Sequence, residues 1–266
     1  MSLRNALYWL YFRLQRRIVP KLRFSQDLYE EILRAHLPSS GAWLDLGCGH
    51  RLLQSWRARH EAELLQGRNV FGVDYDLDSL KAHQNIHRKA RADIAALPFR
   101  DQVFELVTAN MVVEHLEHPG TQFAEVCRVL KPGGRFLFHT PNLYGYTTVL
   151  ARLTPEFMKK KLVRLVEGRE EQDVFRTYYR ANDLKTIRAL AERTGFEVEQ
   201  SRLIASTAAL IVLFPLVIVE LFWIRFLLTR AGRPLRPGLI VVLRKRQQGS
   251  LTVKGEQRHF RRSQQP

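Results

Sequence analysis

Apolar and polar positions recur with two periods along the chain, and each change of period marks a new element. Helical spacing predicts helices over 3–19 and 26–37. Further on, short apolar runs predict strands at 43–46, 69–73, 104–109 and 135–139, with amphipathic stretches between them, including one over 119–130. Strands that alternate with helices at this spacing predict a parallel, doubly wound α/β sheet.

The second half of the chain completes this pattern and then interrupts it. A last helix is predicted over 183–194, ended by Gly195, and apolar runs at 196–203 and 239–244 predict two more strands. Residues 204–238 stand where a short hairpin loop would suffice. Their centre, 208–219, is uncharged but contains Pro215, and it is shorter than the roughly 20 apolar residues of a spanning helix.

The position of this apolar segment limits how it could meet a membrane. A single crossing would place the strand at 239–244 on the opposite side from its own sheet. We therefore expect either a helix, kinked at Pro215, that dips into one leaflet, or a re-entrant pair. A buried core helix is the alternative, since apolar runs of this length are ambiguous.

The first predicted helix combines an apolar stripe with aromatic and basic residues, and Pro20 ends it. Charge interrupts its apolar residues, and no small-residue cleavage site follows, so it lacks the form of a signal peptide. This composition favours a helix that lies in a membrane interface. Packing on the core through the same stripe is the alternative.

The net charge of +16 lies in the flanks of the sequence. Residues 1–23 carry six basic residues and no acid, residues 225–236 carry four arginines and no acid, and residues 244–262 carry seven basic residues against Glu256. The rest of the sequence carries equal numbers of basic and acidic residues. A nucleic-acid enzyme more often carries positive charge around its cleft, so nucleic acid is not the expected partner, whereas basic flanks suit an anionic membrane surface.

The two cysteines, Cys48 and Cys127, are too few for a disulfide framework and favour a reducing compartment. Neither has a zinc-type partner at useful spacing, so both are interpreted as structural and no metal site is predicted.

Candidate chemistry begins in WLDLGCGHR at 43–51, where a strand meets a small-residue turn. Ligands of parallel α/β sheets bind beyond the carboxyl ends of strands. Gly47 and Gly49 would permit positive φ and close approach of a ligand, and Asp45 is expected to point at it. A lone G-x-G is a weak signal, because the third glycine of the dinucleotide motif is missing.

A second acidic residue follows the next strand. Asp74 closes the strand at 69–73, and a carboxylate there can accept hydrogen bonds from both hydroxyls of a ribose. Tyr75 beside it could lie against a base.

Five motifs in order then resemble the class I S-adenosylmethionine-dependent methyltransferases, of the type 11-like group, over roughly residues 40–200. They are LDLGCGH at 44–50, VFGVDYD at 70–76, ADIAALPF at 92–99, FELVTANMVVEHL at 104–116 and RVLKPGGRFLFHTPN at 128–142. The resemblance implies a seven-stranded Rossmann-like sheet with helices on both faces, whose last two strands form an antiparallel pair.

The resemblance also implies a binding site for the cofactor S-adenosyl-L-methionine. Its methionine part would be lined by the turn residues Asp45, Gly47, Cys48 and Gly49; its adenosine part would be held by Asp74, Tyr75, Asp93 and the backbone of Ile94, with Asn110 closing the pocket. His50 and Arg51 depart from the small residues usual at this turn. Arg51 could pair with the cofactor carboxylate or lie exposed in solvent.

Methyl transfer from a sulfonium is an in-line displacement, so positioning supplies much of the acceleration. An oxygen nucleophile also needs a base, and the candidates are Glu114, His115 and His139. His115 is the first choice because a histidine can titrate near neutrality, although it could be only a capping residue. Glu114 and His115 alone are too few ligands for a metal site.

Four regions are expected: a basic amphipathic helix (1–24), a methyltransferase domain (25–204 and 239–246), an apolar membrane-facing insert (205–238) and a basic, disordered tail (247–266). Residues 143–173 are expected to shape the acceptor pocket. In the aromatic segment at 175–182, Tyr178, Tyr179 and Arg180 are expected to face the acceptor; the alternative is that two of the three only pack against the start of the next helix.

The expected function is methylation, on an oxygen, of a hydrophobic or lipid-linked acceptor by an enzyme docked on the cytoplasmic face of the cell membrane. An RNA methyltransferase would explain the basic tails but not the apolar insert. A cofactor-binding scaffold without catalysis is the third hypothesis.

Overall fold

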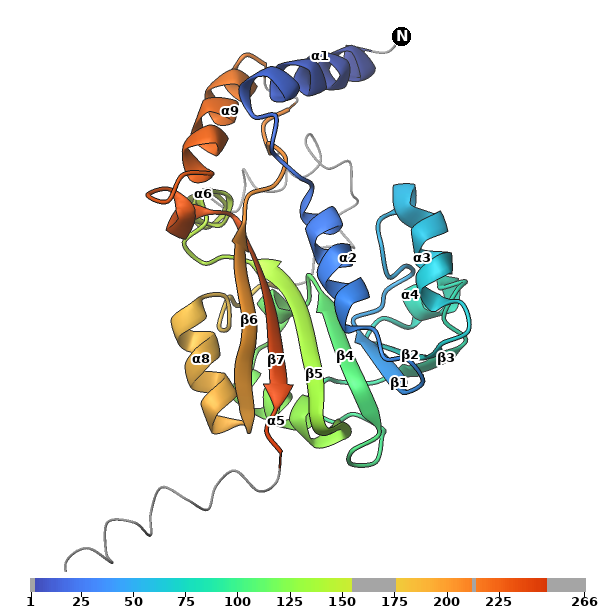
Figure 1. Cartoon of the computed structure of the whole chain (residues 1–266). Helices are drawn as coiled ribbons and strands as arrows, with labels where there is room; N and C mark the ends of the chain where they lie inside the picture. The colour runs from blue at the N-terminus through green and yellow to red at the C-terminus, as the bar shows by residue number, and fades with distance from the viewer. Residues whose placement is uncertain (1–2, 155–175, 212–213, 248–266) are drawn as a thin grey trace, which may run out of the picture.

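The computed structural model describes residues 3–154, 176–211 and 214–247, and its centre is a seven-stranded sheet (Figure 1). The strand order is β3-β2-β1-β4-β5-β7-β6. The strands are β1 Ala42–Leu46, β2 Asn69–Asp74, β3 Arg88–Arg91, β4 Phe104–Asn110, β5 Leu130–Pro141, β6 Phe196–Ile204 and β7 Gly238–Lys245. β1 to β5 are parallel, whereas β7 is antiparallel to both β5 and β6. The predicted Rossmann-like sheet with its antiparallel pair is confirmed.

Two apolar cores cover the two faces of the sheet. On one face lie α2 Ser25–His36, α3 Ala58–Leu65 and α4 Leu77–Ala82; on the other lie α5 Pro119–Val129 and α8 Leu184–Arg193. All five residues of β1 are buried, as expected for a central parallel strand covered on both faces. Neighbours Trp43 and Leu44 therefore enter different cores.

Two strands differ from the predicted set. β3, Arg88–Arg91, has no counterpart among the predicted strands, and residues 92–94 lie in the connection after it, where the Ala92 N–H donates to the Asp74 carbonyl at 3.1 Å. β5 begins at Leu130, earlier than the predicted strand at 135–139, and so includes residues 131–134. There the pairing with β4 shifts register, and Gly133 has φ +77°. The Pro-Gly-Gly sequence forms a bulge in the ladder instead of ending it.

The apolar insert leaves the sheet after β6 and returns to it at β7, so both of its ends lie at the same edge. Its helix, α9 Leu216–Leu227, begins directly after Pro215. The expected helix kinked at Pro215 is therefore wrong, because the proline begins the helix and does not bend it. In the described ranges, every helix is too short or too polar to cross a bilayer.

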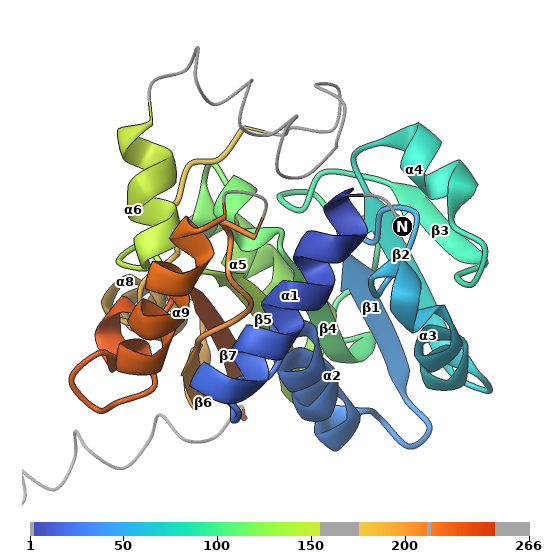
Figure 2. The same ribbon diagram turned by 90° about the horizontal axis from the view of Figure 1, so that it is seen from above.

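α9 packs against α1 Leu3–Ile18 beyond the carboxyl ends of the central strands (Figures 1 and 2). The two helices share a third core that includes Tyr11, Val217, Leu221 and Ile224. α6 Tyr146–Leu153 follows β5. The expected pocket residues 155–173 and the tail from 248 lie outside the described residues. The fold thus places α1, α6 and α9 at the edge where a ligand of this sheet would bind.

Candidate functional site

The two glycines of the turn after β1 have different roles. Gly47 and Gly49 have φ of +61° and +52°, in the left-handed region that favours glycine. A Cβ on Gly47 would lie 2.4 Å from Cγ2 of Val112, whereas a Cβ on Gly49 would meet nothing within 4 Å. Gly47 therefore permits packing against the β4 connection, and only Gly49 borders open space that a ligand could fill.

Asp74 is fixed beside this open turn. Its Oδ2 accepts the Gly49 N–H at 2.7 Å, and its Oδ1 accepts the Asp76 N–H at 2.9 Å. A carboxylate oxygen has a second lone pair, so both can still accept a hydroxyl. The open space at Gly49 and this oriented carboxylate fit the ribose diol of an adenosyl cofactor. Tyr75 next to it is exposed, with the Arg91 guanidinium 5.3 Å from its ring centroid.

The connection after β3 lies close to Asp74. Asp93 is exposed, and its Oδ1 accepts the Ala95 N–H at 2.8 Å. Ile94 is half-buried against the core on the α5 face. The Ala92 bond to the Asp74 carbonyl joins the two connections, so the residues proposed for ribose and adenine lie on neighbouring segments.

Asp45 of β1 is buried. Its Oδ1 accepts a hydrogen bond from Thr108 Oγ1 at 2.5 Å, and Thr108 in turn accepts from Trp43 Nε1 at 2.7 Å. Burial raises the pKa of Asp45 to about 8, more than its bond to Thr108 lowers it. At neutral pH this carboxyl is mainly protonated, which a buried carboxyl without a cation requires.

Cys48 also faces the interior. A Cβ on Gly72 of β2 would lie 2.7 Å from its Sγ, and burial raises the pKa of the thiol. This cysteine is therefore a packing residue, and its backbone alone borders the turn.

Asn110 and His139, at the ends of β4 and β5, form a polar chain with Gln26 of α2. Asn110 Nδ2 donates to Gln26 Oε1 at 3.0 Å, so Asn110 Oδ1 is the acceptor for His139 Nδ1, also at 3.0 Å. This places the imidazole proton on Nδ1 and the lone pair on Nε2. Burial lowers the pKa of His139 to about 4, which keeps the ring neutral.

Gln26 and Tyr29 are site residues that sequence reasoning missed. The Tyr29 ring centroid lies 6.0 Å from the His139 ring centroid. Tyr29 is fully buried, and this burial, followed by the charge of nearby Asp45, raises the pKa of its phenol. The order of elements along the chain could have predicted these two residues. A helix that precedes the first strand and runs antiparallel to it begins at the carboxyl edge of the sheet, so the first turn of that helix lies over the site.

Glu114 and His115, in the short 3-10 turn Val113–His115, have different surroundings. Glu114 is buried, its Oε2 accepts from Thr140 Oγ1 at 3.0 Å, and burial raises its pKa. Asn182 Nδ2 donates to the same Thr140 oxygen at 2.7 Å. His115 is half-exposed, and its Nδ1 lies 2.9 Å from the Arg176 carbonyl, so Nδ1 carries the proton. Among the three candidate bases, His115 is the most accessible.

The aromatic segment before α8 is attached to this turn. The N–H groups of Tyr178 and Tyr179 donate to the Glu114 carbonyl, and Arg180 donates to the Glu117 carbonyl. The guanidiniums of Arg176 and Arg180 lie 5.1 and 5.3 Å from the Tyr178 ring centroid. The predicted acceptor segment therefore lies beside His115.

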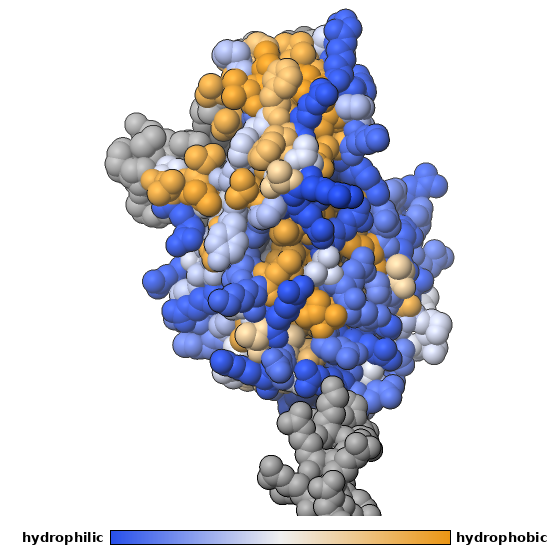
Figure 3. Space-filling view, turned by 60° about the vertical axis from the view of Figure 1, so that its left-hand side comes forward, coloured by the Kyte–Doolittle hydropathy of each residue, from blue (hydrophilic) through white to orange (hydrophobic). Residues whose placement is uncertain are grey.

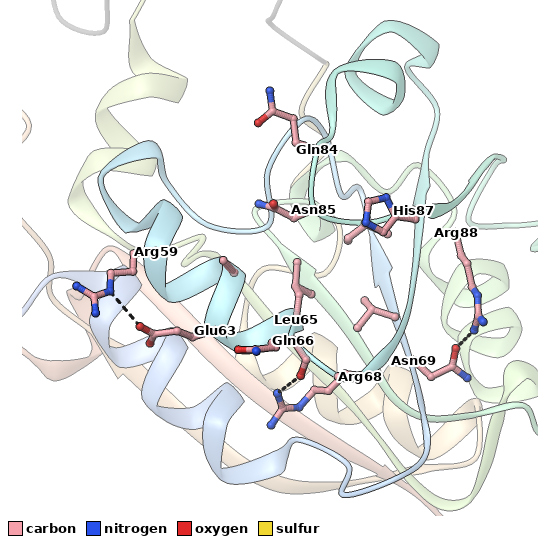
Figure 4. Close-up of a pocket in the computed structure, with 14 residues that line it drawn as sticks. Arg59, Glu63, Leu65, Gln66, Arg68, Asn69, Gln84, Asn85, His87 and Arg88 are labelled. Carbon is pink, nitrogen blue, oxygen red and sulfur yellow. Dashed lines mark hydrogen bonds and ion pairs between the residues drawn. The ribbon is translucent and has the colours of Figure 1, made fainter.

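His50 and Arg51 are both exposed and line a small cavity of about 210 Å³ with Ala82, Gln84 and Asn85. A larger cavity of about 1100 Å³ lies elsewhere, at the starts of β2 and β3 (Figure 4). Two of its charged side chains, Arg59 and Glu63, pair with each other at 3.3 Å, while Arg68 donates to the Leu64 carbonyl and Arg88 to Asn69 Oδ1. Because it lies at the amino ends of these strands, it is separate from the Gly49 turn. The described residues include no group of three or more His, Cys, Asp or Glu side chains that could hold a metal ion.

Known proteins resemble this chain in the segment that forms this edge of the sheet. Residues 44–138 match a family model described as a methyltransferase domain. The chain is 32% identical over 117 residues to a demethylmenaquinone methyltransferase of Lactiplantibacillus plantarum, covering 41% of this chain and 48% of that one. It is 35% identical over 101 residues to a malonyl-[acyl-carrier protein] O-methyltransferase of Erwinia billingiae, covering 36% and 38%. The chain thus spans half or less of the length of these relatives.

The fold also has counterparts among solved structures. A S-adenosylmethionine-dependent methyltransferase from Mesorhizobium loti superposes with a TM-score of 0.51 and 24% identity, covering 81% of this chain and 96% of that one. At this identity the likeness concerns the fold.

Proposed function

We propose that this chain, which belongs to the class I S-adenosylmethionine-dependent methyltransferases, methylates an oxygen of a hydrophobic or lipid-linked acceptor at a membrane surface. The bound cofactor supplies a methyl group on a positively charged sulfonium. The chain's own residues bind the cofactor, orient the acceptor and remove a proton from it.

Cofactor binding is assigned to the turn after β1 and the ends of β2 and β3. Asp74 would accept the two ribose hydroxyls, because its carboxylate is already oriented by Gly49 and Asp76. Asp93 and the backbone of Ile94 would hold the adenine. At the other end of the site, Asn110 would close the pocket from β4, in the orientation that Gln26 and His139 give it.

His115 is proposed as the base that accepts the acceptor's hydroxyl proton. Its Nδ1–H donates to the Arg176 carbonyl, so Nε2 is the ring nitrogen that would accept this proton. The buried carboxyl of Glu114 is held by Thr140 and would position the turn that carries His115. His139 would serve by orienting Asn110, since it is buried.

The single observation that supports a membrane acceptor is the apolar surface of α1 and α9. Figure 3 shows hydrophobic residues gathered over these helices and hydrophilic residues dominating farther from them. On α9, Val219 is 68% exposed and Phe222 57%, and Trp9 on α1 is 56% exposed. Apolar patches of this kind on a soluble surface indicate contact with a partner or a membrane.

The charges of α1 and α9 favour lipid as that partner. Exposed arginines border the apolar residues, among them Arg13 and Arg16 on α1 and Arg225 on α9. Arginine next to interfacial aromatic residues suits anionic lipid, which supports the proposed location on the cytoplasmic face of the cell membrane. One named relative is a demethylmenaquinone methyltransferase, which supports a hydrophobic acceptor, and the other is a malonyl-[acyl-carrier protein] O-methyltransferase, which supports transfer to oxygen.

The test uses the full chain, methyl-labelled cofactor and fractionated cell membranes. Label is expected in the lipid extract, and His115→Gln is expected to reduce its rate of appearance strongly. Label that appears only in RNA would support the nucleic-acid alternative, and cofactor binding without any labelled product would support the scaffold.

Membrane binding is measured separately, by flotation with anionic liposomes. The wild-type chain is expected to float, and the double variant V219Q/F222Q is expected to remain at the bottom. Equal flotation of both proteins would exclude the α9 surface as the anchor.

A further inference from the structure

We infer that α6 is a third lipid-contacting helix, which places the bilayer beside the acceptor half of the site and leaves the adenosine half facing water. The inference rests on the proposed membrane association and adds its orientation. It also specifies the acceptor, which would be an amphiphile whose reactive group lies at headgroup level and reaches the ends of β4 and β5 directly from the bilayer.

α6 has an exposed apolar stripe. Tyr146, Val149, Leu150 and Leu153 recur at helical spacing on one side of the helix. Val149 is 39% exposed, Leu150 52% and Leu153 74%. Isolated exposed apolar residues need no explanation, but three on one short helix form a surface.

This stripe is continuous with the apolar surface of α9. The Tyr146 hydroxyl donates to Glu220 Oε1 at 2.7 Å, and its ring meets that of Trp223 edge-on, with centroids 6.5 Å apart. The ring centroid of Trp223 in turn lies 5.2 Å from that of Phe226. Because Tyr146 is the first residue of α6, these contacts join the two helices where the stripe on α6 begins.

The charges of the three helices suit a lipid surface. α1 and α6 contain no acidic residue, and Glu220 is the one acid in α9. Glu220 is 5% exposed and also accepts the N–H groups of Ala209 and Leu210 at 2.7 and 2.8 Å. What these helices expose is therefore apolar, neutral polar or cationic, with Arg152 on α6 and Arg225 on α9 at the border. Anionic lipid complements such a surface.

α6 is attached to the acceptor side of the site. β5 ends at Pro141, and the next residue, Asn142, donates through Nδ2 to the carbonyls of Pro234 and Arg236 at 2.9 and 2.8 Å. Its N–H donates to the Pro237 carbonyl at 2.7 Å. The end of β5, the start of α6 and the return of the insert are thus held together.

The adenosine side lies at the other end of the strand order. Asp74 and Asp93 follow β2 and β3, which are separated from β5 by β1 and β4. The exposed side chains of α4 are Leu77, Ala82 and the charged pair Asp78–Lys81 at 3.3 Å. A bilayer on α1, α6 and α9 would leave this side in water, so the cofactor could exchange while the protein stays docked.

The test measures partition of the full chain into anionic vesicles of phosphatidylglycerol and phosphatidylcholine. The double variant L150Q/L153Q is expected to bind at least about tenfold more weakly, because each leucine loses apolar burial. The matched control is Trp56→Gln. Trp56 is 69% exposed and lies in the connection between β1 and α3, on the half of the sheet that carries the adenosine side, so its replacement should leave partition unchanged. Leu150, Leu153 and Trp56 are all exposed, so both variants should fold.

The outcomes separate the orientation from the membrane association itself. If L150Q/L153Q binds like wild type while V219Q/F222Q does not, α9 alone makes contact and the orientation is wrong. If Trp56→Gln weakens binding equally, the adenosine side also faces lipid, and the inference fails. Lipid-free self-association that L150Q/L153Q abolishes would assign the α6 surface to a second copy of the chain. A wild-type chain that does not bind the anionic vesicles would overturn both proposals.

Discussion

The Tyr146 hydroxyl donates to Glu220 Oε1 at 2.7 Å and thereby joins α6 to α9 across 74 residues of sequence. Glu220 lies in an apolar helix, and its carboxylate is satisfied by three donors from outside that helix. The charge that interrupts the apolar run of the insert is thus the residue that holds the run in place.

Removing this carboxylate is expected to destabilise the protein. Glu220→Ala leaves the Tyr146 hydroxyl and two backbone N–H groups without their acceptor and should reduce the free energy of unfolding by about 3 kcal/mol. Tyr146→Phe removes one donor and should cost only about 1 kcal/mol. Urea unfolding measures both, with the exposed Tyr144→Phe as control. Wild-type stability in Glu220→Ala would contradict the assignment.

The two glycines of the turn should respond differently to alanine. Gly47→Ala adds a left-handed alanine and a contact with Val112, and should cost more than about 3 kcal/mol of stability. Gly49→Ala adds only the backbone cost of roughly 1–2 kcal/mol, but its methyl group enters the open space and should weaken cofactor binding.

A second substitution distinguishes the contact from the backbone strain. G47A/V112A should recover part of the stability lost in Gly47→Ala, because the two methyl groups that meet the new Cβ are gone. Thermal melts follow stability, and calorimetry follows cofactor binding. No recovery in the double variant would show that backbone strain alone causes the loss.

Asp74→Ala should reduce affinity for S-adenosylmethionine by about 100-fold or more, since two charge-assisted hydrogen bonds to the ribose would be lost. Calorimetric titration measures the change. Asp78→Asn alters an exposed carboxylate nearby and should bind the cofactor normally. Unchanged affinity in Asp74→Ala would remove the ribose assignment.

His139 should make the protein less stable in mild acid. Its pKa is lowered to about 4 in the folded state, against about 6.5 when unfolded, so the unfolded chain binds the extra proton between these values. Above pH 6.5 the neutral ring of His139 makes its full contribution to the free energy of unfolding. This contribution, roughly 3 kcal/mol, is lost as pH falls toward 4.

His139→Gln should therefore remove this contribution, so the unfolding free energy of the variant should rise relative to that of the wild type as pH falls from about 6.5 to 4. Denaturant unfolding at several pH values measures the slope of this free energy against pH. The exposed His118→Gln is the matched control and should retain the wild-type slope. A wild-type slope in His139→Gln would place the acid sensitivity elsewhere.

The sequence by itself determined the sheet and the location of its ligand edge. Periodicity located β1, β2, β4 and most of the helices, because each apolar face repeats at the spacing of its own secondary structure. The ordered motifs from 44–50 to 128–142 then predicted the family, its cofactor and the antiparallel strands at the end. Even the return of the insert to its own sheet followed from the position of the last apolar run.

Only the tertiary structure decided what each apolar or polar side chain contacts. Gly47 lies against Val112, Asp45 is buried against Thr108, and Gln26 reaches Asn110 from a helix that the motifs do not include. The stripe on α6 is visible in the sequence, but its continuation on α9 depends on a contact between distant segments. Periodicity reports which face of an element avoids water, whereas its partner is set by long-range packing, which a local pattern does not encode.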